Sequence, residues 1–577
     1  MIVQSYVELT ENVEELKPLT TARLTEDHTS SGESWHFVQE CLTRCSESHT
    51  QCRTGTKGPW YPTRLLDLRS SDATSKQCRL ITTSAEQPTG DYVTLSHRWG
   101  QANISQLTKS TVSAMEDDID VSQLPTSFQD AISVTRERLG ISYLWIDSLC
   151  IFQDRDDLTD WTREAALMHQ IYGNAYCNLS ATGAEDSTQG FFFPKRGDQL
   201  CHVEIEFAPI LFDPQAKLIK YAAFEFYYWE KHLARAPLYR RGWVVQERLL
   251  TPRVIHFGAT QLFWECAGLT ACEAYPHGLP PALPKNSKMH LKHLSPGAKG
   301  KRLSALVPKD SDPRFFAPHL WPRILEIYTQ CQLTKPADKI IALSSIAKRM
   351  RGILHDEYVV GMWRRYLESE LLWQVNHHRQ SNGDPSYRPA TYRAPSFSWA
   401  SIEGAINPGT PTDQGLLFSV EGLFLDFYTN DNTGLIKNGH IILKGMLKSL
   451  ELRPHPLADT YWSSEVDGID IVEDSDEPYE RMGPLVSLDI DQPDFDAENA
   501  ANRLYCMPAR GPAATVSKHL VCLIFEHLGK GEFMRRGCLT AIKQCEIDLI
   551  LNSSSDGQDM PCIQYDSNTG QHLIRVI

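Results

Sequence analysis

The most constraining feature of this sequence is a regular alternation of short apolar runs and helical patterns between residues 78 and 182. The apolar runs are CRLITT (78–83), YVTLS (92–96), YLWI (143–146) and YCNLSAT (176–182). Between them, SFQDAISVTRERLG (127–140) and WTREAALMHQIYGNA (161–175) have apolar residues at helical spacing. Strands that alternate with helices are typical of a parallel sheet with helices on its faces, so we predict an α/β fold with a mainly parallel sheet.

Shifts in composition divide the chain around this α/β domain, which we place at 60–265. Residues 1–59 have apolar positions at helical spacing from Trp35 to Cys45, which predicts a helical extension. Prolines accumulate after residue 275, so we predict a Pro-rich linker at 266–318, followed by a helical region at 319–405. The remainder, 406–577, has strand-like runs such as HIILKGMLKSLEL and predicts a β-rich domain, with an exposed acidic loop at about 464–499.

Charge and composition disfavour several classes of protein. The chain has 57 Lys and Arg and 72 Asp and Glu residues. Its net charge of -15 disfavours electrostatic binding of nucleic acid or anionic membrane along the whole chain. No apolar run is long enough for a membrane span, and the acidic start lacks the pattern of a secretory signal, so we expect a soluble cytoplasmic protein. The odd count of 15 Cys, without framework spacing, favours reduced thiols. No phosphate-binding loop, nucleophile elbow or HExxH motif is present.

Polar residues follow the apolar run of YVTLSHRWG directly. Ser96, His97 and Trp99 would lie at the carboxyl end of this strand, where open α/β sheets bind their ligands. His97 could then serve as an acid or base and Trp99 as a stacking surface. The alternative is structural, because a Ser-His pair at a strand end also satisfies loop amides.

A second group follows the strand at YLWI. Asp147 and Cys150 would lie at the same edge, beside His97 if the two strands are neighbours. A Cys and a His are the minimum for nucleophilic catalysis if the pKa of the thiol is lowered, although a Cys in an apolar run is more often packed in a core. Asp147 is the stronger candidate, because a carboxylate at a strand end needs hydrogen-bond partners or a ligand. Gln153 opens an acidic loop whose oxygens either cap the next helix or hold a divalent metal.

Two helices carry further candidates with open alternatives. Glu164 follows Trp161 by three residues and lies either on the surface or facing the cleft. In RGWVVQERLL (241–250), Trp243, Gln246 and Glu247 share one helical face, which predicts either a packing helix with a buried polar network or a ligand contact.

The segment before the α/β domain contains Cys41, Cys45, His49 and Cys52, residue types that suit zinc. In one continuous helix, Cys41 and Cys52 would lie roughly 16 Å apart at about 1.5 Å of rise per residue, too far for one tetrahedral ion. Zinc would require the helix to break near His49. We therefore predict no metal site.

Together these segments resemble the fungal heterokaryon incompatibility (HET) domain family. The resemblance rests on six motifs in the family's order, WYPTRLLDL (60–68), YVTLSHRWG (92–100), PTSFQDAI (125–132), YLWIDSLCIFQD (143–154), DWTREAALMHQIYGNAYCNLSA (160–181) and RGWVVQERLL (241–250). Downstream, DKIIALSSIA, YVVGMWRRYLESELLW and YRAPSFSWAS extend it to about residue 405.

The resemblance implies a role in nonself recognition, in which incompatible alleles that meet in a fused fungal cell trigger growth arrest and death. The family's domain is considered similar to Toll/interleukin-1 receptor-like (TIR) folds, with YVTLSHRWG, YLWIDS and YCNLSA as the first three strands. Some TIR domains cleave NAD at the nicotinamide bond with a Glu on a helix after the third strand. After NLSATGAEDSTQGFF no clear Trp-Cys-x-x-Glu pattern follows, and the nearest carboxylate is Glu185.

Two hypotheses of different class follow. In the first, the protein is a death-signalling effector that acts through self-association or protein partners, with NAD as a substrate if it is catalytic. In the second, it is an enzyme or accessory protein of a fungal biosynthetic pathway that uses a pocket with His97, Asp147 and Cys150. The catalytic candidates are Asp147, His97, Cys150 and Glu164, and the ligand-binding candidates are Ser96, Trp99, Gln153 and Glu185.

Overall fold

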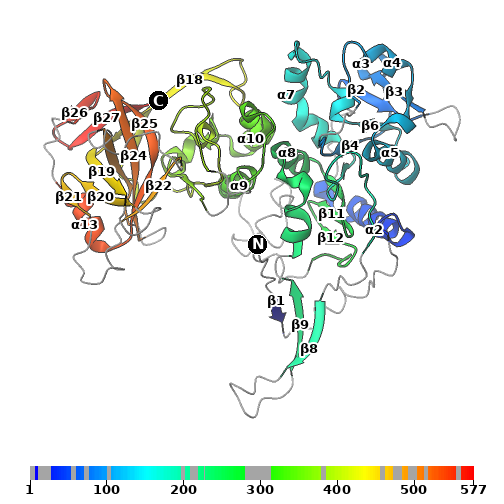
Figure 1. The fold of residues 1–577 in the computed structure, drawn as a ribbon, viewed down its shortest axis with the longest axis horizontal. Coiled ribbons are helices and arrows are strands. Elements are labelled where there is room, and N and C mark those ends of the chain that lie inside the picture. Colours follow the sequence, from blue (N-terminus) through cyan, green and yellow to red (C-terminus); the bar gives the residue numbers. More distant parts are fainter. Residues whose placement is uncertain are drawn as a thin grey trace. The chain divides into compact units, whose positions relative to one another are not determined.

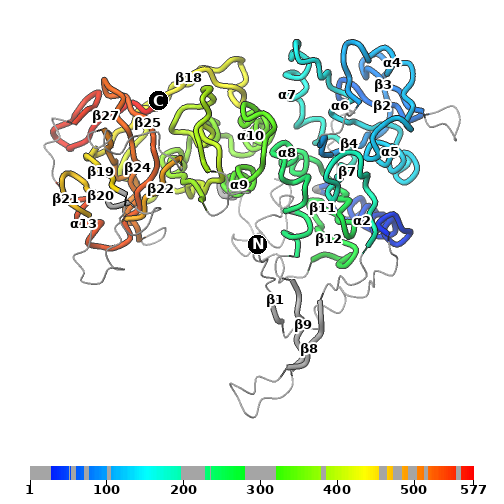
Figure 2. Tube along the Cα trace, in the orientation of Figure 1, coloured from blue at the N-terminus to red at the C-terminus, as the bar shows by residue number. Residues whose placement is uncertain are grey.

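The structure is a computed structural model of the chain (Figures 1 and 2). It describes residues 7–10, 28–52, 60–69, 77–100, 105–195, 202–207, 219–225, 228–279, 313–377, 385–454, 462–471, 484–490, 503–512, 518–553 and 560–577. Most of the predicted linker and parts of the predicted N-terminal extension and acidic loop lie outside these residues. The chain forms two compact units, an N-terminal unit (Met1–Ser311) and a C-terminal unit (Asp312–Ile577).

The N-terminal unit is built on a nine-stranded mixed sheet with the order β12-β11-β10-β7-β4-β6-β2-β3-β5. Its central strands are parallel to one another, namely β6 (Tyr143–Trp145), β4 (Tyr92–Ser96), β7 (Asn178–Ser180) and β10 (Arg253–Phe257). Antiparallel strands flank this centre, with β11 (Leu262–Cys266) and β12 (Thr270–Cys272) on one side and β2 (Arg64–Asp67), β3 (Gln77–Thr82) and β5 (Ile119–Asp120) on the other.

The prediction of a mainly parallel sheet is thus confirmed only for the centre. The connection between β10 and β11 spans residues 258–261, which is too short for the crossover that a parallel neighbour requires. The same holds for β11 and β12, so this edge folds back on itself as hairpins.

Helices cover both faces of this sheet. The described α-helices of the unit are α2 (Gly32–Ser48), α3 (Thr83–Glu86), α4 (Val112–Asp117), α5 (Thr126–Ser133), α6 (Asp147–Cys150), α7 (Thr159–Asn174) and α8 (Gly242–Leu250). A separate small sheet has the order β1 (Val7–Thr10), β9 (Ile219–Glu225) and β8 (His202–Phe207).

Among the parallel strands, the spatial order is second, first, third and fourth in chain order. The next parallel strand in the chain, β6, therefore lies on one side of β4, and the one after it, β7, lies on the other side of β4. In a doubly wound sheet, the place where the order reverses opens a crevice outside the carboxyl ends of the strands, and ligands bind there. This switch point lies between β4 and β7.

The two faces of the central sheet differ in chemistry because successive strand residues point to opposite sides. The strand register aligns a set of buried polar side chains on one face, which we call the polar face and define by Thr94, Ser96, Asn178, Ser180, His256 and Glu265. The opposite, apolar face is defined by Val93, Leu95, Leu144, Leu179 and Ile255.

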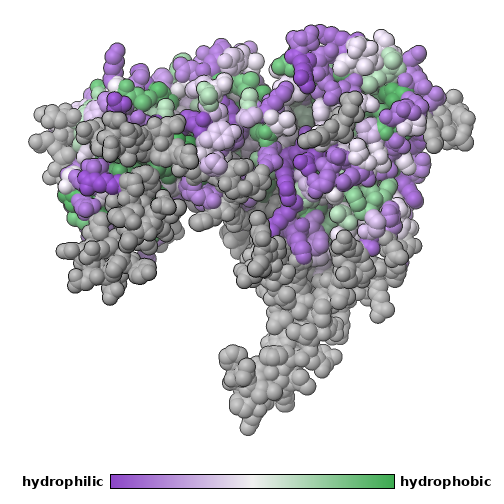
Figure 3. Space-filling view, viewed as in Figure 1, coloured by the Kyte–Doolittle hydropathy of each residue, from purple (hydrophilic) through white to green (hydrophobic). Residues whose placement is uncertain are grey.

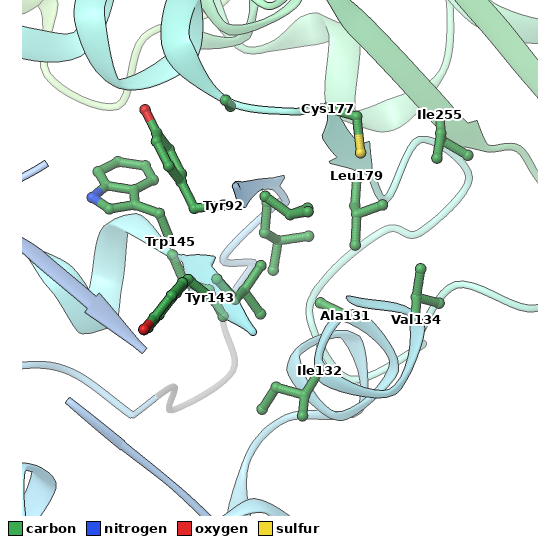
Figure 4. Close-up of a cluster of buried hydrophobic side chains, with 14 of the residues drawn as sticks. Tyr92, Ala131, Ile132, Val134, Tyr143, Trp145, Cys177, Leu179 and Ile255 are labelled. Atoms are coloured by element: carbon green, nitrogen blue, oxygen red, sulfur yellow. The ribbon is translucent and has the colours of Figure 1, made fainter. Parts of the chain in front are cut away.

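Apolar packing on the second face holds the unit together. Figure 4 shows Ala131 of α5 and Val134, the first residue after α5, beside Leu179 of β7, and all three are buried in one core. Trp35 of α2 contributes to the same core through a contact with Phe257, their ring centroids 6.3 Å apart. The helix of the predicted N-terminal extension is therefore part of the α/β core. On the polar face, Tyr172 of α7 contacts Trp145 edge-on at 5.7 Å.

The C-terminal unit begins with helices and continues as a large, mostly antiparallel sheet in which β25 and β27 pair in parallel, so the predicted β-rich region is confirmed. Its described α-helices are α9 (Pro313–Tyr328), α10 (Ile341–Leu354), α11 (Leu367–Glu370) and α13 (Gln544–Asn552). The sheet has the order β17 (Ser419–Phe427), β18 (Ile436–Gly445), β27 (Gln571–Val576), β25 (Glu532–Ala541), β24 (Leu520–Gly529), β23 (Leu504–Arg510), β19 (Lys448–Pro454), β20 (Trp462–Val466) and β21 (Ile469–Asp470).

Further short strands complete this unit. They are β22 (Leu485–Leu488), which pairs with β25, and β26 (Gln564–Asp566), which pairs with β27. Two separate two-stranded sheets pair β13 (Tyr358–Val359) with β14 (Met362–Trp363) and β15 (Gln374–Val375) with β16 (Ile406–Asn407). The expected exposed loop at 464–499 thus contains strands, because Val466, Ile471 and Leu488 pack into a buried cluster.

On the face seen in Figure 3, hydrophilic residues prevail over the described part of the N-terminal unit, with smaller hydrophobic areas between them. Such a pattern is typical of a surface in contact with water. Among the described helices, none has both the length and the apolar character that a membrane span requires.

A buried ion pair joins α8 to β11 on the polar face. The Arg248 guanidinium donates from Nε to Glu265 Oε2 at 2.6 Å and from Nη2 to Oε1 at 2.7 Å, and the two side chains are 1% and 0% exposed. His256 Nε2 lies 3.1 Å from the same carboxylate, and Tyr239 Oη lies 2.6 Å from His256 Nδ1. Every charge in this network therefore has a partner.

We expect Arg248→Met to lower the free energy of unfolding of the N-terminal unit by about 3–5 kcal/mol, because it leaves the Glu265 carboxylate buried without its main partner. Urea unfolding of the full chain, followed by tryptophan fluorescence, measures this loss. Arg98→Met is the matched control, since the Arg98–Glu185 pair has side chains 40% and 62% exposed and should contribute less than about 1 kcal/mol. Equal losses in the two variants would contradict the role of the buried pair.

Candidate functional site

The candidate site lies at the carboxyl end of β4, at the switch point with β7. Two loops meet there, one after Ser96 and one after Ser180. Arg98 Nη1 donates to Glu185 Oε2 at 2.8 Å, and Ser187 Oγ donates to the carbonyl oxygen of Arg98 at 2.9 Å. At Gly100, where φ is +66°, an added Cβ would lie 2.3 Å from Asp186 Cβ, so the close approach of the loops requires glycine.

A hydrogen-bonded chain runs along the polar face to a carboxyl group of α8. Thr94 Oγ1 donates to Asn178 Oδ1 at 3.0 Å, and Asn178 Nδ2 donates to Ser96 Oγ at 2.9 Å. Ser96 Oγ in turn donates to Glu247 Oε2. All four side chains are buried, and Glu247 is 7% exposed. The strands thus supply a fixed donor to a carboxyl group that arrives from a helix 151 residues later.

The environment shifts the proton affinity of Glu247 strongly. Burial is the main cause that raises its pKa to about 7, and the negative charge of Asp147 adds to this effect. Hydrogen bonds from Ser96 and Tyr172 and the positive charge of Arg241 act in the opposite direction. A carboxyl group that titrates near neutral pH is suited to acid–base or electrostatic catalysis.

Asp147 and Trp99 lie together at the same edge. Asp147 begins α6 directly after β6, and its Oδ1 accepts a hydrogen bond from the backbone N–H of Ser148 at 2.7 Å. Trp99 Nε1 donates to Asp147 Oδ2 at 3.2 Å. The Asp147 side chain is 28% exposed, so this carboxylate remains in contact with solvent beside an aromatic surface.

His97 lies next to Asp147 but is deeply buried. Its Nδ1 is 3.8 Å from Asp147 Oδ1, beyond hydrogen-bond distance, and its ring meets Phe128 edge-on at 4.9 Å. Burial lowers the pKa of His97 to about 4, with the Asp147 charge opposing and the Arg241 charge adding. His97 Nε2 has no hydrogen-bond partner among the described residues. The imidazole is therefore neutral at pH 7.

Cys150 and Gln153 belong to the same segment but have different surroundings. The Cys150 side chain is buried, and burial raises the pKa of its thiol to about 12. A thiol of this kind is protonated at neutral pH, which gives little support to a nucleophilic role and to a His97/Asp147/Cys150 pocket. Gln153 Nε2 donates to the carbonyl oxygen of Ile151 at 3.0 Å and holds the loop in place.

The two remaining carboxylate candidates lie in opposite environments. Glu164 is 1% exposed, so the alternative of a surface position is wrong; its Oε1 accepts from Thr63 Oγ1 at 2.7 Å and from Arg163 Nε at 3.1 Å. Glu185 is exposed and paired with Arg98 on the loop after β7. The structure therefore brings together Ser96, His97, Trp99 and Asp147, with Glu247 as their neighbour.

Glu247 is the site residue that the sequence motifs did not single out as catalytic. Its position four residues after Trp243, on the helix after the third parallel strand, could have drawn attention to it. Trp243 packs edge-on against Trp161 of α7, with ring centroids 5.9 Å apart. The burial of Glu247 against Ser96 depends on the long-range pairing of α8 with the polar face, which no local pattern reveals.

We compare the free energy of unfolding of the wild type with that of Glu247→Gln. We expect this difference to shift against the wild type as the pH rises. The pKa of Glu247 is raised from 4.5 to about 7, so its contribution to stability is complete below the lower value and is lost as the pH passes through the higher one. The relative loss between about pH 5 and pH 8 should be on the order of 3 kcal/mol. Urea unfolding over this pH range measures it, and Glu185→Gln, at an exposed position, should keep the wild-type profile. A profile of Glu247→Gln parallel to wild type would contradict the expectation.

Comparison with known protein families finds a match for the part of the chain that carries this site. The model of the family described as Heterokaryon incompatibility protein (HET) matches residues 92–247. The match begins at the first residue of β4 and ends at Glu247, so it spans the site from its first strand to its buried carboxyl group. Comparisons with curated proteins and with solved structures find no match to the chain. The resemblance of the motifs to the heterokaryon incompatibility (HET) family is thereby confirmed for residues 92–247.

Proposed function

We propose that this protein acts in fungal nonself recognition and cell-death signalling by cleaving NAD in its HET domain, with Glu247 as the catalytic carboxylate. The observation that carries the proposal is the buried Glu247 carboxyl group, held by Ser96 at the switch point of the sheet. Open α/β sheets bind ligands at this position.

The comparison with TIR domains supports the choice of Glu247. Those TIR domains that cleave NAD use a Glu on a helix after the third strand, and α8 follows β7, the third of the parallel strands. The segment Trp243-Val-Val-Gln-Glu247 keeps the Trp and the Glu of the Trp-Cys-x-x-Glu pattern, with Val244 in place of Cys. The order second, first, third and fourth of the parallel strands is also that of a doubly wound sheet.

The reaction needs groups that stabilise a developing positive charge. The bond between ribose C1′ and the nicotinamide nitrogen breaks, nicotinamide leaves with the electron pair, and water adds to C1′ with loss of a proton to give ADP-ribose. Ionised Glu247 would stabilise the oxocarbenium-like centre and bind the ribose hydroxyls, because its charge acts more strongly in a desolvated site. Trp99 offers a stacking surface for a ring, and Asp147 beside it offers a hydrogen-bond acceptor.

Access to Glu247 sets a condition for the reaction. With 7% of the residue exposed, the ribose reaches the carboxylate only after a rearrangement of the loops at this edge. Self-association is the proposed trigger, in line with a role in signalling. Activity should therefore rise more steeply than linearly with protein concentration.

Loss of NAD and release of nicotinamide by the purified full chain, followed by chromatography over a range of protein concentrations, tests the proposal. We expect Glu247→Gln to lower kcat by about 100-fold or more, because it removes the charge that stabilises the transition state. Asp147→Asn should have a smaller effect. Glu185→Gln, which changes an exposed carboxylate, should stay within about two-fold of wild type.

The measurements of NAD loss and of growth arrest together distinguish a catalytic signal from a signal that depends on self-association alone. Absence of NAD loss with folded, concentrated wild-type protein would contradict the enzymatic part of the proposal. Growth arrest on expression in a fungal host, retained by Glu247→Gln, would then assign the signal to self-association alone. NAD loss that Glu247→Gln leaves unchanged would instead exclude this residue as the catalytic carboxylate.

A further inference from the structure

Four metal-ligating side chains converge at the end of α2. Cys45 lies in its last turn, His49 follows its final residue Ser48, Cys52 ends the short 3-10 turn Thr50–Cys52, and Cys266 ends β11. One ligand atom from each, three Sγ atoms and a His ring nitrogen, lie within 4.8 Å of one another. The helix thus breaks at the position that a zinc site requires, and a distant strand replaces Cys41 as the fourth ligand.

We propose that Cys45, His49, Cys52 and Cys266 bind one Zn²⁺ ion in a structural Cys₃His site. Thiolate sulfur and imidazole nitrogen are the ligands that Zn²⁺ prefers, and four protein ligands fill its tetrahedral shell, as structural sites do. With Zn–S bonds of about 2.3 Å, neighbouring ligand atoms are roughly 3.8 Å apart, so the observed cluster needs only small inward shifts. The expectation that the chain has no metal site is replaced by this proposal.

The sulfur ligands of the cluster are buried, and N–H donors are directed at them. The three Cys residues are at most 1% exposed. Arg253 Nε donates to Cys45 Sγ at 3.3 Å, and His49 Nδ1 lies 3.3 Å from Cys266 Sγ. The backbone N–H groups of Ala267 and Gly268 are directed at Cys52 Sγ. Donors directed at sulfur are the outer partners that tune metal sites.

The turn after β11 is shaped to fit the His49 ring. A Cβ added at Gly268 would lie 2.6 Å from both Cγ and Cδ2 of His49, closer than real Cβ contacts. Any side chain at this position would therefore displace the imidazole. The sequence Cys266-Ala-Gly268 thus supplies one ligand, two backbone donors and the space for a second ligand.

The ion would connect segments that are distant in the sequence. His49 and Cys266 are 217 residues apart, and both lie outside the 92–247 segment that the family model matches. Cys266 directly follows Glu265, the buried partner of Arg248, and Arg248 directly follows Glu247. A metal at this site would fix the end of β11 and, through the ion pair, the position of α8.

The test is the zinc content of the full chain, purified under reducing conditions after growth with added zinc and dialysed before elemental analysis. We expect about one zinc per chain in the wild type, and its loss in Cys52→Ser and Cys266→Ser. Cys41→Ser is the matched control, because Cys41 is buried in the same helix but lies outside the cluster, and it should retain zinc. Gly268→Ala should weaken zinc binding about 10–100-fold, as loss of outer support does.

A second measurement keeps the test valid if a variant fails to fold. Wild-type protein refolded with Co²⁺ should show the visible absorption of a tetrahedral thiolate site, and added Zn²⁺ should abolish it. Folded wild type without zinc, zinc that is retained in Cys266→Ser, or a disulfide between two of the three Cys in protein prepared under reducing conditions would each overturn the proposal.

Discussion

The buried ion pair between Arg248 and Glu265 is the interaction on which the rest of the N-terminal unit depends. Two charges in a desolvated sheet face cost free energy unless each meets its partner in good geometry, so the pair tolerates little displacement. The two parallel hydrogen bonds between them fix the rotation and height of α8 on the sheet. Because Glu247 precedes Arg248, the same placement brings its carboxyl group to Ser96. The ion pair of Arg248 thereby positions the carboxyl group of Glu247, the candidate catalytic residue directly before it.

Burial has opposite consequences for the titratable groups around the site. It raises the pKa of Glu247 to about 7 and that of Cys150 to about 12, whereas it lowers the pKa of His97 to about 4. Each shift favours the neutral form, since a low dielectric disfavours charge. Near neutral pH the imidazole and the thiol are therefore fixed in one state, and Glu247 is the group of the three that changes charge.

Local patterns predicted much of the architecture, because the alternation of strands and helices depends on residue periodicity alone. The apolar runs around Val93, Leu144 and Leu179 form the central strands, and the helices between them lie where the spacing placed them. The candidates Ser96 and Asp147 lie at one sheet edge because parallel strands share their carboxyl ends. The antiparallel edges and the strands in the acidic segment were not predicted, because hairpin pairing and burial of its few apolar residues depend on distant partners.

The sequence by itself determined the resemblance of residues 92–247 to the HET family, the α/β alternation and the edge of the sheet where polar side chains gather, since these follow from order and periodicity along the chain. Only the tertiary structure decided which polar groups meet. Glu247 reaches Ser96 across 151 residues, and Cys266 joins His49 across 217. The sheet order places β10 beside β7 and β11 beside β10, so the end of the domain returns to strands formed earlier in the chain. The physical reason is that proton affinity and metal binding depend on neighbours in space, and the sequence specifies those neighbours only through the whole fold.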